Sequence, residues 1–222
     1  MTTIRNFLKS DSLILILLFI PIIYLFWMWP SLPDRVPLHW NFRGEIDRYG
    51  SKQSLVWIVV GLNLFIYLLM LVLPKIAARK QQLEAMGNKY NRLRLVLQLF
   101  MASISVVIIL MAEETNNWNK DFLLGGCFIL FMVLFGNYVG SIRPNYFLGV
   151  RTPWTLQSDK VWRKTHHLTG RLLMAGALLG VILLLALPQS WGMMSVVIIM
   201  TAAFLIPAVC SFFWFQQEQT TS

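Results

Sequence analysis

Six long apolar runs divide this chain, and none of them contains an Asp, Glu, Lys, Arg or His residue. They are residues 13–29, 55–73, 95–111, 122–139, 172–187 and 193–213. Each run approaches the roughly 20 residues that an α-helix needs to cross about 30 Å of hydrocarbon. Only 13% of the residues are charged, whereas a soluble domain has about 25%. The sequence therefore predicts an all-α integral membrane bundle of six transmembrane helices, built as a single domain over residues 1–222.

The basic residues are sorted between the loops, and this predicts the orientation of the bundle. Of the 19 Lys and Arg residues, 14 lie at the N-terminus and in the second and fourth loops, and five lie in the first and third loops. By the positive-inside rule, both termini are expected in the cytoplasm. The net charge of +9 follows from this sorting. It does not indicate direct binding of nucleic acid, which would require a basic face on a soluble module.

The first loop, residues 30–54, carries a pattern typical of extended chain. From Val36 to Phe42, apolar side chains alternate with Pro, His and Asn. A period of two predicts an extended segment with one buried face, and Pro37 restricts such a segment to an edge or to an unpaired strand. We therefore expect an ordered extracytoplasmic loop that lies over the outer mouth of the bundle.

This outer loop also holds polar side chains that could meet a ligand. The candidate contacts to a peptide or lipid are His39, Trp40, Asn41 and Asp47. Asp34, His39, Glu45 and Asp47 could also coordinate a metal, but they follow no established ligand spacing, and the nearby arginines can pair with the carboxylates instead. A third interpretation is that His39 is a hydrogen-bonded structural residue. The prediction is that the protein binds no metal and no cofactor.

The fourth loop, residues 140–171, is expected to be cytoplasmic and to have a defined shape. Pro144 and Pro153 move their preceding residues away from the helical region, and Gly149 permits backbone angles that other residues resist. These residues predict an irregular segment from Asn145 to Trp154. A cytoplasmic amphipathic helix should then begin near Ser158, whose hydroxyl can cap it, and lead into the fifth apolar run.

The inner-loop side chains allow two interpretations. The candidate partner contacts are Asn145, Arg151, Trp154 and His166. Arg151 and Arg163 could bind phosphate or carboxylate, or Arg151 could satisfy loop carbonyls while Arg163 pairs with Asp159. The hydroxyl residues near the histidines match no hydrolase motif, so the sequence predicts no catalytic residue and no enzymatic activity. Gly136 and Gly140 have the spacing of a small-residue packing site between helices.

The two loops together resemble the SdpI family of bacterial membrane proteins. One matching segment runs Pro33-Asp-Arg-Val-Pro-Leu-His-Trp-Asn-Phe-Arg-Gly44, followed by Asp47 and Tyr49-Gly-Ser-Lys52. It resembles the N-terminal domain of unknown function in that family. The other begins with Gly136-Asn137, continues through Arg143-Pro-Asn-Tyr-Phe-Leu-Gly-Val-Arg-Thr-Pro-Trp-Thr-Leu156, and ends with Val161-Trp162 and Thr165-His166. The six spans also line up, so the resemblance covers nearly the whole chain.

This resemblance implies a multi-pass protein of the bacterial cytoplasmic membrane that gives immunity to, or senses, a membrane-active peptide toxin. Its implied partners are membrane lipid, a peptide toxin outside and a cytoplasmic repressor protein that it sequesters. The alternative is a small transporter or lipid-acting membrane enzyme that uses residues 143–167. A water-lined cavity joining that loop to Asn63, Gln98 or Asn137 would favour the alternative. The absence of ionisable groups in the apolar runs weighs against a proton relay.

Overall fold

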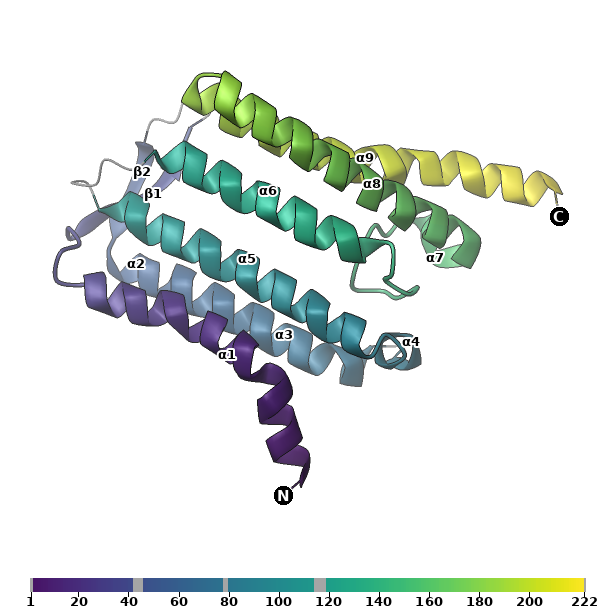
Figure 1. Ribbon diagram of the computed structural model, residues 1–222, viewed down its shortest axis with the longest axis horizontal. Coiled ribbons are helices and arrows are strands. Elements are labelled where there is room, and N and C mark those ends of the chain that lie inside the picture. The colour runs from purple at the N-terminus through teal and green to yellow at the C-terminus, as the bar shows by residue number, and fades with distance from the viewer. Residues whose placement is uncertain (1, 42–45, 78–79, 114–118, 222) are drawn as a thin grey trace.

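The structure is a computed structural model that describes residues 2–41, 46–77, 80–113 and 119–221 (Figure 1). Helices dominate it, and two short strands lie between the first and second long helices. In chain order the elements are α1 (Thr2–Met28), β1 (Arg35–Trp40), β2 (Ile46–Ser51), α2 (Gln53–Val56), the π-helical turn η1 (Trp57–Gly61), α3 (Leu62–Ile76), α4 (Lys80–Glu84), α5 (Asn88–Ala112), α6 (Lys120–Val139), α7 (Pro153–Gln157), α8 (Asp159–Ala186) and α9 (Gln189–Thr221).

Within the described residues, six helical segments are long and apolar enough to cross a membrane. They are Asp11–Met28, Gln53–Ile76, Asn88–Ala112, Lys120–Val139, Asp159–Ala186 and Trp191–Thr220. The prediction of an all-α bundle of six membrane helices is confirmed. Several helices extend beyond the apolar runs, because apolar composition marks only the part of a helix that lies in hydrocarbon. Outside that layer, capping groups determine where a helix ends.

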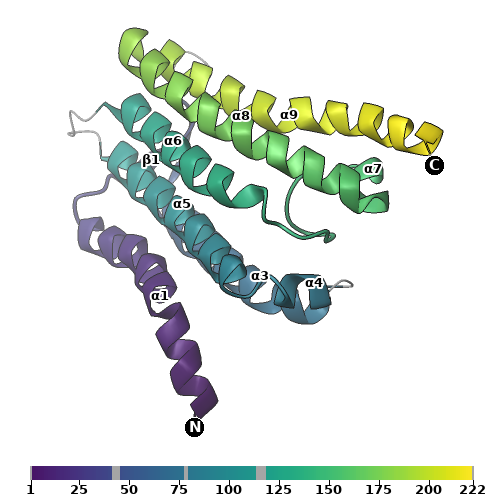
Figure 2. The same cartoon turned by 45° about the vertical axis from the view of Figure 1, so that its right-hand side comes forward.

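The helices form two packed groups that meet at the centre of the molecule. Helices α1 and α3 pack against α5, whereas α8 and α9 pack against α6, and α5 and α6 contact each other. The strands lie at one end of the bundle, here called the sheet end (Figure 1). Helices α4 and α7 and the chain after α6 lie at the opposite end, here called the loop end. The turned view in Figure 2 shows the N-terminal part of α1 diverging from the other helices.

Two apolar clusters hold these groups together. The larger one joins α3, α5, α6, α8 and α9 and includes Leu73, Leu93, Met132, Trp162 and Leu173. The smaller one lies at the sheet end and includes Leu25, Leu32, Val36, Leu55, Val59 and Ile109. Large side chains such as Trp57 and Leu178 are instead 79% and 69% exposed. Apolar surface this extensive is typical of a face that meets lipid.

Strand β1 confirms the extended segment predicted around Val36, and the described part of the first loop forms a small sheet. β1 pairs with β2 in an antiparallel sheet, with Val36 opposite Gly50 and His39 opposite Arg48. Val36 is fully buried in the smaller cluster, so β1 is fixed to the ends of α1, α2 and α5. By contrast, β2 is exposed along most of its length. The sheet therefore presents β2 outward from a fixed base.

The expected small-residue packing at the end of α6 is also present. A Cβ atom added to Gly170 of α8 would lie 2.8 Å from the carbonyl oxygen of Gly136, and one added to Gly140 would lie 3.0 Å from Nδ1 of His167. These distances leave no room for a side chain at the α6–α8 contact. The two helices therefore approach closely just below the loop end.

Candidate functional site

Asn145 organises the irregular chain at the loop end. Its Oδ1 accepts hydrogen bonds from the backbone N–H groups of Phe147 and Leu148, at 2.8 and 2.7 Å. Its Nδ2 donates to the carbonyls of Arg143 and Leu148, at 2.8 and 3.3 Å. One side chain, itself fully buried, thus satisfies four backbone groups that have no helical partner. Asn residues stabilise turns in this way.

His166 fixes the next part of the same loop to α8. Its Nε2 accepts from the backbone N–H of Val150 at 3.1 Å, and its Nδ1 lies 2.8 Å from the carbonyl of Trp162. Because Nε2 is an acceptor, Nδ1 carries the proton and the ring is held in one neutral tautomer. The ring stacks on the Trp162 indole with a centroid distance of 4.1 Å. His166 is fully buried.

Gly149 makes the close approach of the loop to His166 possible. Its φ angle is +95°, in the region that favours glycine. A Cβ atom there would lie 2.1 Å from Nε2 of His166. The conformation and the space both require glycine at this position.

The short helix α7 attaches the loop to the C-terminal helix. Thr152 caps α7 in a reciprocal arrangement with Thr155, and its hydroxyl lies 2.9 Å from that of Ser211 in α9. Trp154 packs edge-on against Phe212, with ring centroids 5.0 Å apart. The expected cap at Ser158 is confirmed, because its hydroxyl accepts from the Val161 N–H at 3.2 Å.

The outward surface of this loop differs in composition from its interior. Arg143, Tyr146, Phe147 and Arg151 are exposed, and we call them the inner-loop surface. The guanidinium of Arg151 donates to the carbonyl of Tyr146, so it braces the loop while facing outward. Of the four predicted inner contacts, Asn145 and His166 are buried, Trp154 is half-buried against α9, and Arg151 alone is exposed. Their role as partner contacts stays a prediction.

The outer candidates lie at the sheet end. Nδ1 of His39 on β1 is 2.6 Å from Oδ1 of Asp47 on β2, in a pair whose side chains are 57% and 42% exposed. Asn41 is half-buried after β1. The backbone of Trp40 belongs to β1, but its side chain lies outside the described part. Glu45 lies outside the described residues altogether.

The two acidic side chains of the outer loop that the structure describes, Asp34 and Asp47, each have a basic neighbour. Asp34 lies 3.5 Å from Nζ of Lys52, and Asp47 faces His39. Among the residues that the structure describes, no three His, Cys, Asp or Glu side chains are grouped so that they could hold a metal ion.

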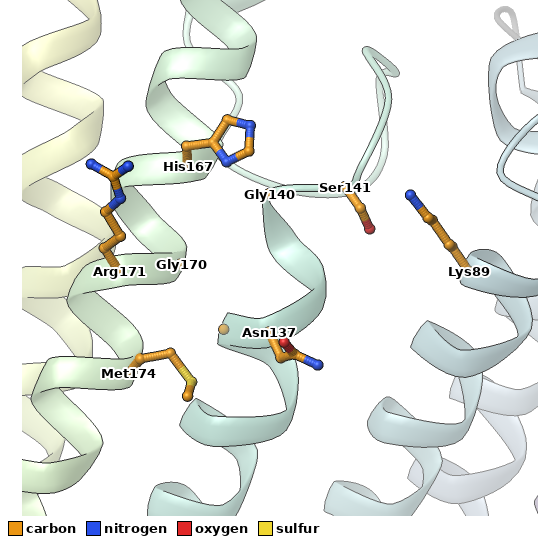
Figure 3. Close-up of a pocket in the computed structure, with 9 residues that line it drawn as sticks. Lys89, Asn137, Gly140, Ser141, His167, Gly170, Arg171 and Met174 are labelled. Carbon is orange, nitrogen blue, oxygen red and sulfur yellow. The ribbon is translucent and has the colours of Figure 1, made fainter.

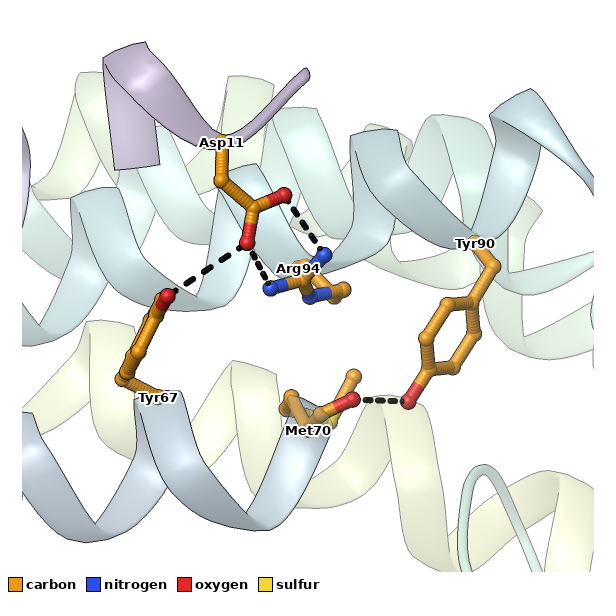
Figure 4. A network of polar contacts seen from close by, with 5 residues as sticks. All are labelled: Asp11, Tyr67, Met70, Tyr90 and Arg94. Carbon is orange, nitrogen blue, oxygen red and sulfur yellow. Dashed lines mark hydrogen bonds and ion pairs between the residues drawn. The ribbon is translucent and has the colours of Figure 1, made fainter. Parts of the chain in front are cut away.

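A buried ion pair that the apolar runs did not predict joins α1 to α5 (Figure 4). Nη1 and Nη2 of Arg94 donate to the two carboxylate oxygens of Asp11, at 2.9 and 2.6 Å. The Tyr67 hydroxyl adds a longer contact of 3.5 Å to Asp11. Asp11 and Arg94 each lie just outside an apolar run, and 83 residues separate them. The sequence signal for this pair was the presence of opposite charges at the edges of two apolar runs, on the same side of the membrane.

Two of the three interior amides form a second network, nearer the middle of the bundle. Nδ2 of Asn63 donates to the Ser105 hydroxyl at 2.7 Å, and Nε2 of Gln98 donates to Oδ1 of Asn63 at 3.1 Å. The side chains of Asn63, Gln98 and Ser105 are buried. The third amide, Asn137, lines a groove of about 610 Å³ at the loop end (Figure 3). This groove also contains Gly140, Ser141 and His167, so it joins Asn137 to the start and end of the inner loop.

The fold and these loops define a class of protein, a six-helix integral membrane protein with an ordered sheet at one end and a shaped loop at the other. The profile of the SdpI/YfhL protein family matches residues 141–211, from the inner loop into α9. The profile of a domain of unknown function, DUF1648, matches residues 16–64, from α1 through the strands into α3. These two matches and the six apolar helices support an SdpI-family protein of the bacterial membrane.

One curated relative resembles the chain along much of its length. The immunity protein SdpI of Bacillus subtilis (strain 168) is 25% identical to it over 146 residues, which cover 66% of this chain and 67% of the relative. No solved structure matches the chain. The family resemblance predicted from the two loop motifs is confirmed.

Proposed function

We propose that this chain is an immunity-type membrane protein that protects its host against a membrane-active peptide. The observation that carries the proposal is that the two matched segments contain the two ordered loops, at opposite ends of one bundle. The relative named as an immunity protein supports the same role. The proposed activity is binding rather than catalysis. The basic loop end faces the cytoplasm in this proposal, following the positive-inside rule.

The proposed contact to the peptide is the sheet end. Ile46, Asp47, Arg48 and Tyr49 of β2 are all exposed, so this strand offers apolar, acidic, basic and aromatic groups together. His39 holds Asp47 in place across the strands. Because Val36 fixes β1 to the helices, a ligand on β2 would bind a preformed surface and lose little entropy on ordering it.

The proposed contact to a cytoplasmic regulator is the inner-loop surface. It combines two arginines with Tyr146 and Phe147, which are 42% and 40% exposed. Arg and aromatic residues are enriched in protein interfaces. Peptide binding outside would release or retain the regulator by shifting the bundle between two states. Helix α5 links the two ends, because Ile109 lies in the cluster that holds β1 and Arg94 binds α1 near the loop end.

The alternative of a small transporter or lipid-acting enzyme has one observation in its favour. The groove beside α6 connects Asn137 with the inner loop. Asn63 and Gln98, however, are buried and bonded to each other rather than to this groove. Of the three interior amides, only Asn137 therefore lines this groove.

The immunity role is tested by expressing the chain in a bacterium that is killed by membrane-active peptides. The chain is expected to raise survival against at least one peptide of a broad panel. Replacement of Asp47 and Arg48 by Asn and Gln should remove that protection, whereas Lys160→Gln at the loop end should retain it. Equal killing with and without the chain across the whole panel, at equal membrane abundance, would rule the role out.

Sequestration of a regulator needs a separate experiment. Cytoplasmic protein captured by the full chain is compared with that captured by Arg151→Ala and by the matched control Arg163→Ala. Selective loss with Arg151→Ala, and a change on adding the protective peptide, is the expected outcome. Identical capture by all three proteins would contradict the proposed partner surface.

A further inference from the structure

We propose that the groove between α5, α6 and α8 binds the phosphate headgroup of an anionic phospholipid. Figure 3 shows this space, which we call the α5–α8 groove. Its lining residues are Lys89, Gly136, Asn137, Gly140, Ser141, His167, Gly170, Arg171 and Met174. The site is independent of the immunity role, since it concerns a lipid rather than a peptide.

Basic side chains line this groove from two helices, and Arg171, which also lines the neighbouring groove beside α9, points away from Lys89 in Figure 3. Lys89 extends from the first turn of α5, and Arg171 and His167 lie on α8 (Figure 3). All three side chains are exposed. Among the described residues that line the groove there is no Asp or Glu. Lys89 and Arg171 are the two charged groups of its lining, and both would attract a bound anion.

Lys89, Arg171 and the Asn137 amide give the groove hydrogen-bond donors. The carbonyls of Tyr138 and Val139 at the end of α6 are already occupied, because they accept from the backbone N–H groups of Ser141 and Ile142 at 2.9 and 3.2 Å. The Ser141 hydroxyl also donates to Tyr138, at 2.7 Å. These two carbonyls at the end of α6 are therefore capped and are not free acceptors toward an anion. The Asn137 amide, which points toward α5 below Lys89 in Figure 3, adds a further donor.

The deeper part of the groove is small and apolar. Gly136 and Gly170 line it where α6 and α8 are in close contact, and Met174, which is 44% exposed, lies one turn further along α8. The cations at the mouth of the groove match the charged headgroup of a phospholipid, and the apolar groups below them match its acyl chains. A free phosphate ion would use only the cations at the mouth.

The groove also lies at the depth of lipid headgroups. Arg171 directly precedes the apolar run 172–187, and Lys89 precedes the run 95–111 by a few residues. At about 1.5 Å of helix rise per residue, the backbone of Lys89 stands roughly 9 Å outside its run. This is just beyond a headgroup layer of about 5–7.5 Å on each side of the hydrocarbon core, and the long Lys side chain can reach back into that layer. Basic pockets between helices on the cytoplasmic side suit anionic lipid headgroups.

A second groove on the other side of α8 provides a control surface. It is lined by Lys160, Arg163, Lys164, His167, Leu168, Arg171 and Trp214, with a volume of about 600 Å³. Lys160 and Arg163 line this second groove and are absent from the α5–α8 groove. Replacing them removes the same charge from the same end of the molecule without touching the proposed site.

The test compares lipid retention by native mass spectrometry on the purified full chain in detergent. Phosphatidylglycerol is expected to stay bound under conditions that remove phosphatidylcholine. The variant Lys89→Gln/Arg171→Gln should weaken phosphatidylglycerol binding about tenfold, because two cations near the phosphate are lost. The control Lys160→Gln/Arg163→Gln should retain it. The charge-preserving variant Lys89→Arg/Arg171→Lys should bind as the parent does.

Three outcomes would overturn the proposal. Equal loss of lipid in the Lys160/Arg163 control would mean a diffuse basic surface rather than a site. Equal retention of phosphatidylcholine would mean that the phosphodiester charge is not recognised. Displacement of phosphatidylglycerol by millimolar inorganic phosphate would mean a free-anion site. Thermal unfolding in mixtures of phosphatidylcholine and detergent confirms that each compared variant is folded. If the glutamine variant is not folded, the charge-preserving variant decides the question.

Discussion

The backbone N–H of Val150 donates to Nε2 of His166 at 3.1 Å, across 16 residues of chain. This bond joins the most irregular part of the inner loop to a long membrane helix. It also assigns the proton of the imidazole to Nδ1, which faces the Trp162 carbonyl. His166, which the sequence predicted as a partner contact, therefore forms hydrogen bonds inside the loop. The inner-loop surface depends on it for its shape.

Replacement of Gly149 should damage this arrangement more than any exposed change in the loop. Gly149→Ala places a Cβ atom 2.1 Å from the His166 ring at a φ of +95°. The backbone strain alone costs about 1–3 kcal/mol, and the ring must also move. The matched control is Gly61→Ala, where a Cβ meets no atom within 4 Å. Denaturant unfolding in detergent should show a large loss for the first variant and no loss for the second.

The tautomer of His166 can be measured directly. Nitrogen NMR on protein labelled at histidine should find Nδ1 protonated and Nε2 unprotonated at neutral pH. His166→Phe should leave the buried Val150 N–H without an acceptor, which costs about 1–3 kcal/mol. Faster proteolytic cleavage within residues 143–152 is the expected consequence. A protonated Nε2, or an unchanged cleavage rate in the Phe variant, would contradict the bond.

The overall fold was predictable because its main signals are local. About 20 uncharged apolar residues in succession define a membrane span regardless of what packs beside it. Strand β1 was foreseen from the alternation around Val36, and the start of α8 from the capping group of Ser158, whereas β2 was not predicted. Each of these patterns depends on residues only a few positions apart.

Contacts between distant segments could not be predicted in the same way. Asn145 and His166 were identified as candidates because they are polar, but the sequence does not say which way they face. They turn inward because irregular backbone packed among helices needs hydrogen-bond partners for its own N–H and C=O groups. The ion pair of Asp11 with Arg94 joins two helices through side chains that a search of apolar runs does not consider.

That ion pair should be a strong determinant of stability. Arg94 is 6% exposed and Asp11 fully buried, so removing either partner leaves an uncompensated buried charge. Asp11→Leu or Arg94→Met alone should cost about 3–5 kcal/mol, whereas the double variant should recover most of the loss. A double-mutant cycle from unfolding in detergent measures this coupling. As a control, Asp34→Asn removes an ion-pair partner that is 97% exposed and should have little effect on stability. Additive losses of stability for the Asp11 and Arg94 variants would refute the coupling.

The α6–α8 contact predicts a steric limit at Gly170. Gly170→Ala would bring a Cβ atom to 2.8 Å from the backbone oxygen of Gly136, which cannot turn away as a side chain can. The helices must separate, at a cost of about 1–3 kcal/mol. The control is Gly126→Ala in α6, where an added Cβ atom has no neighbour within 4 Å. Equal melting temperatures for the two variants would show that the contact is looser than described.

The orientation of the bundle can be established by single-cysteine labelling in intact cells. The native thiols Cys127 and Cys210 lie within helices and are half-buried, so they are first replaced by Ala. Arg48→Cys on β2 and Arg143→Cys on the inner-loop surface are then exposed positions at opposite ends of the bundle. A membrane-impermeant maleimide should label the first in intact cells and the second only after permeabilisation, because basic loops stay in the cytoplasm. The reverse pattern would invert the proposed faces of peptide and regulator, and labelling of both in intact cells would contradict six spans.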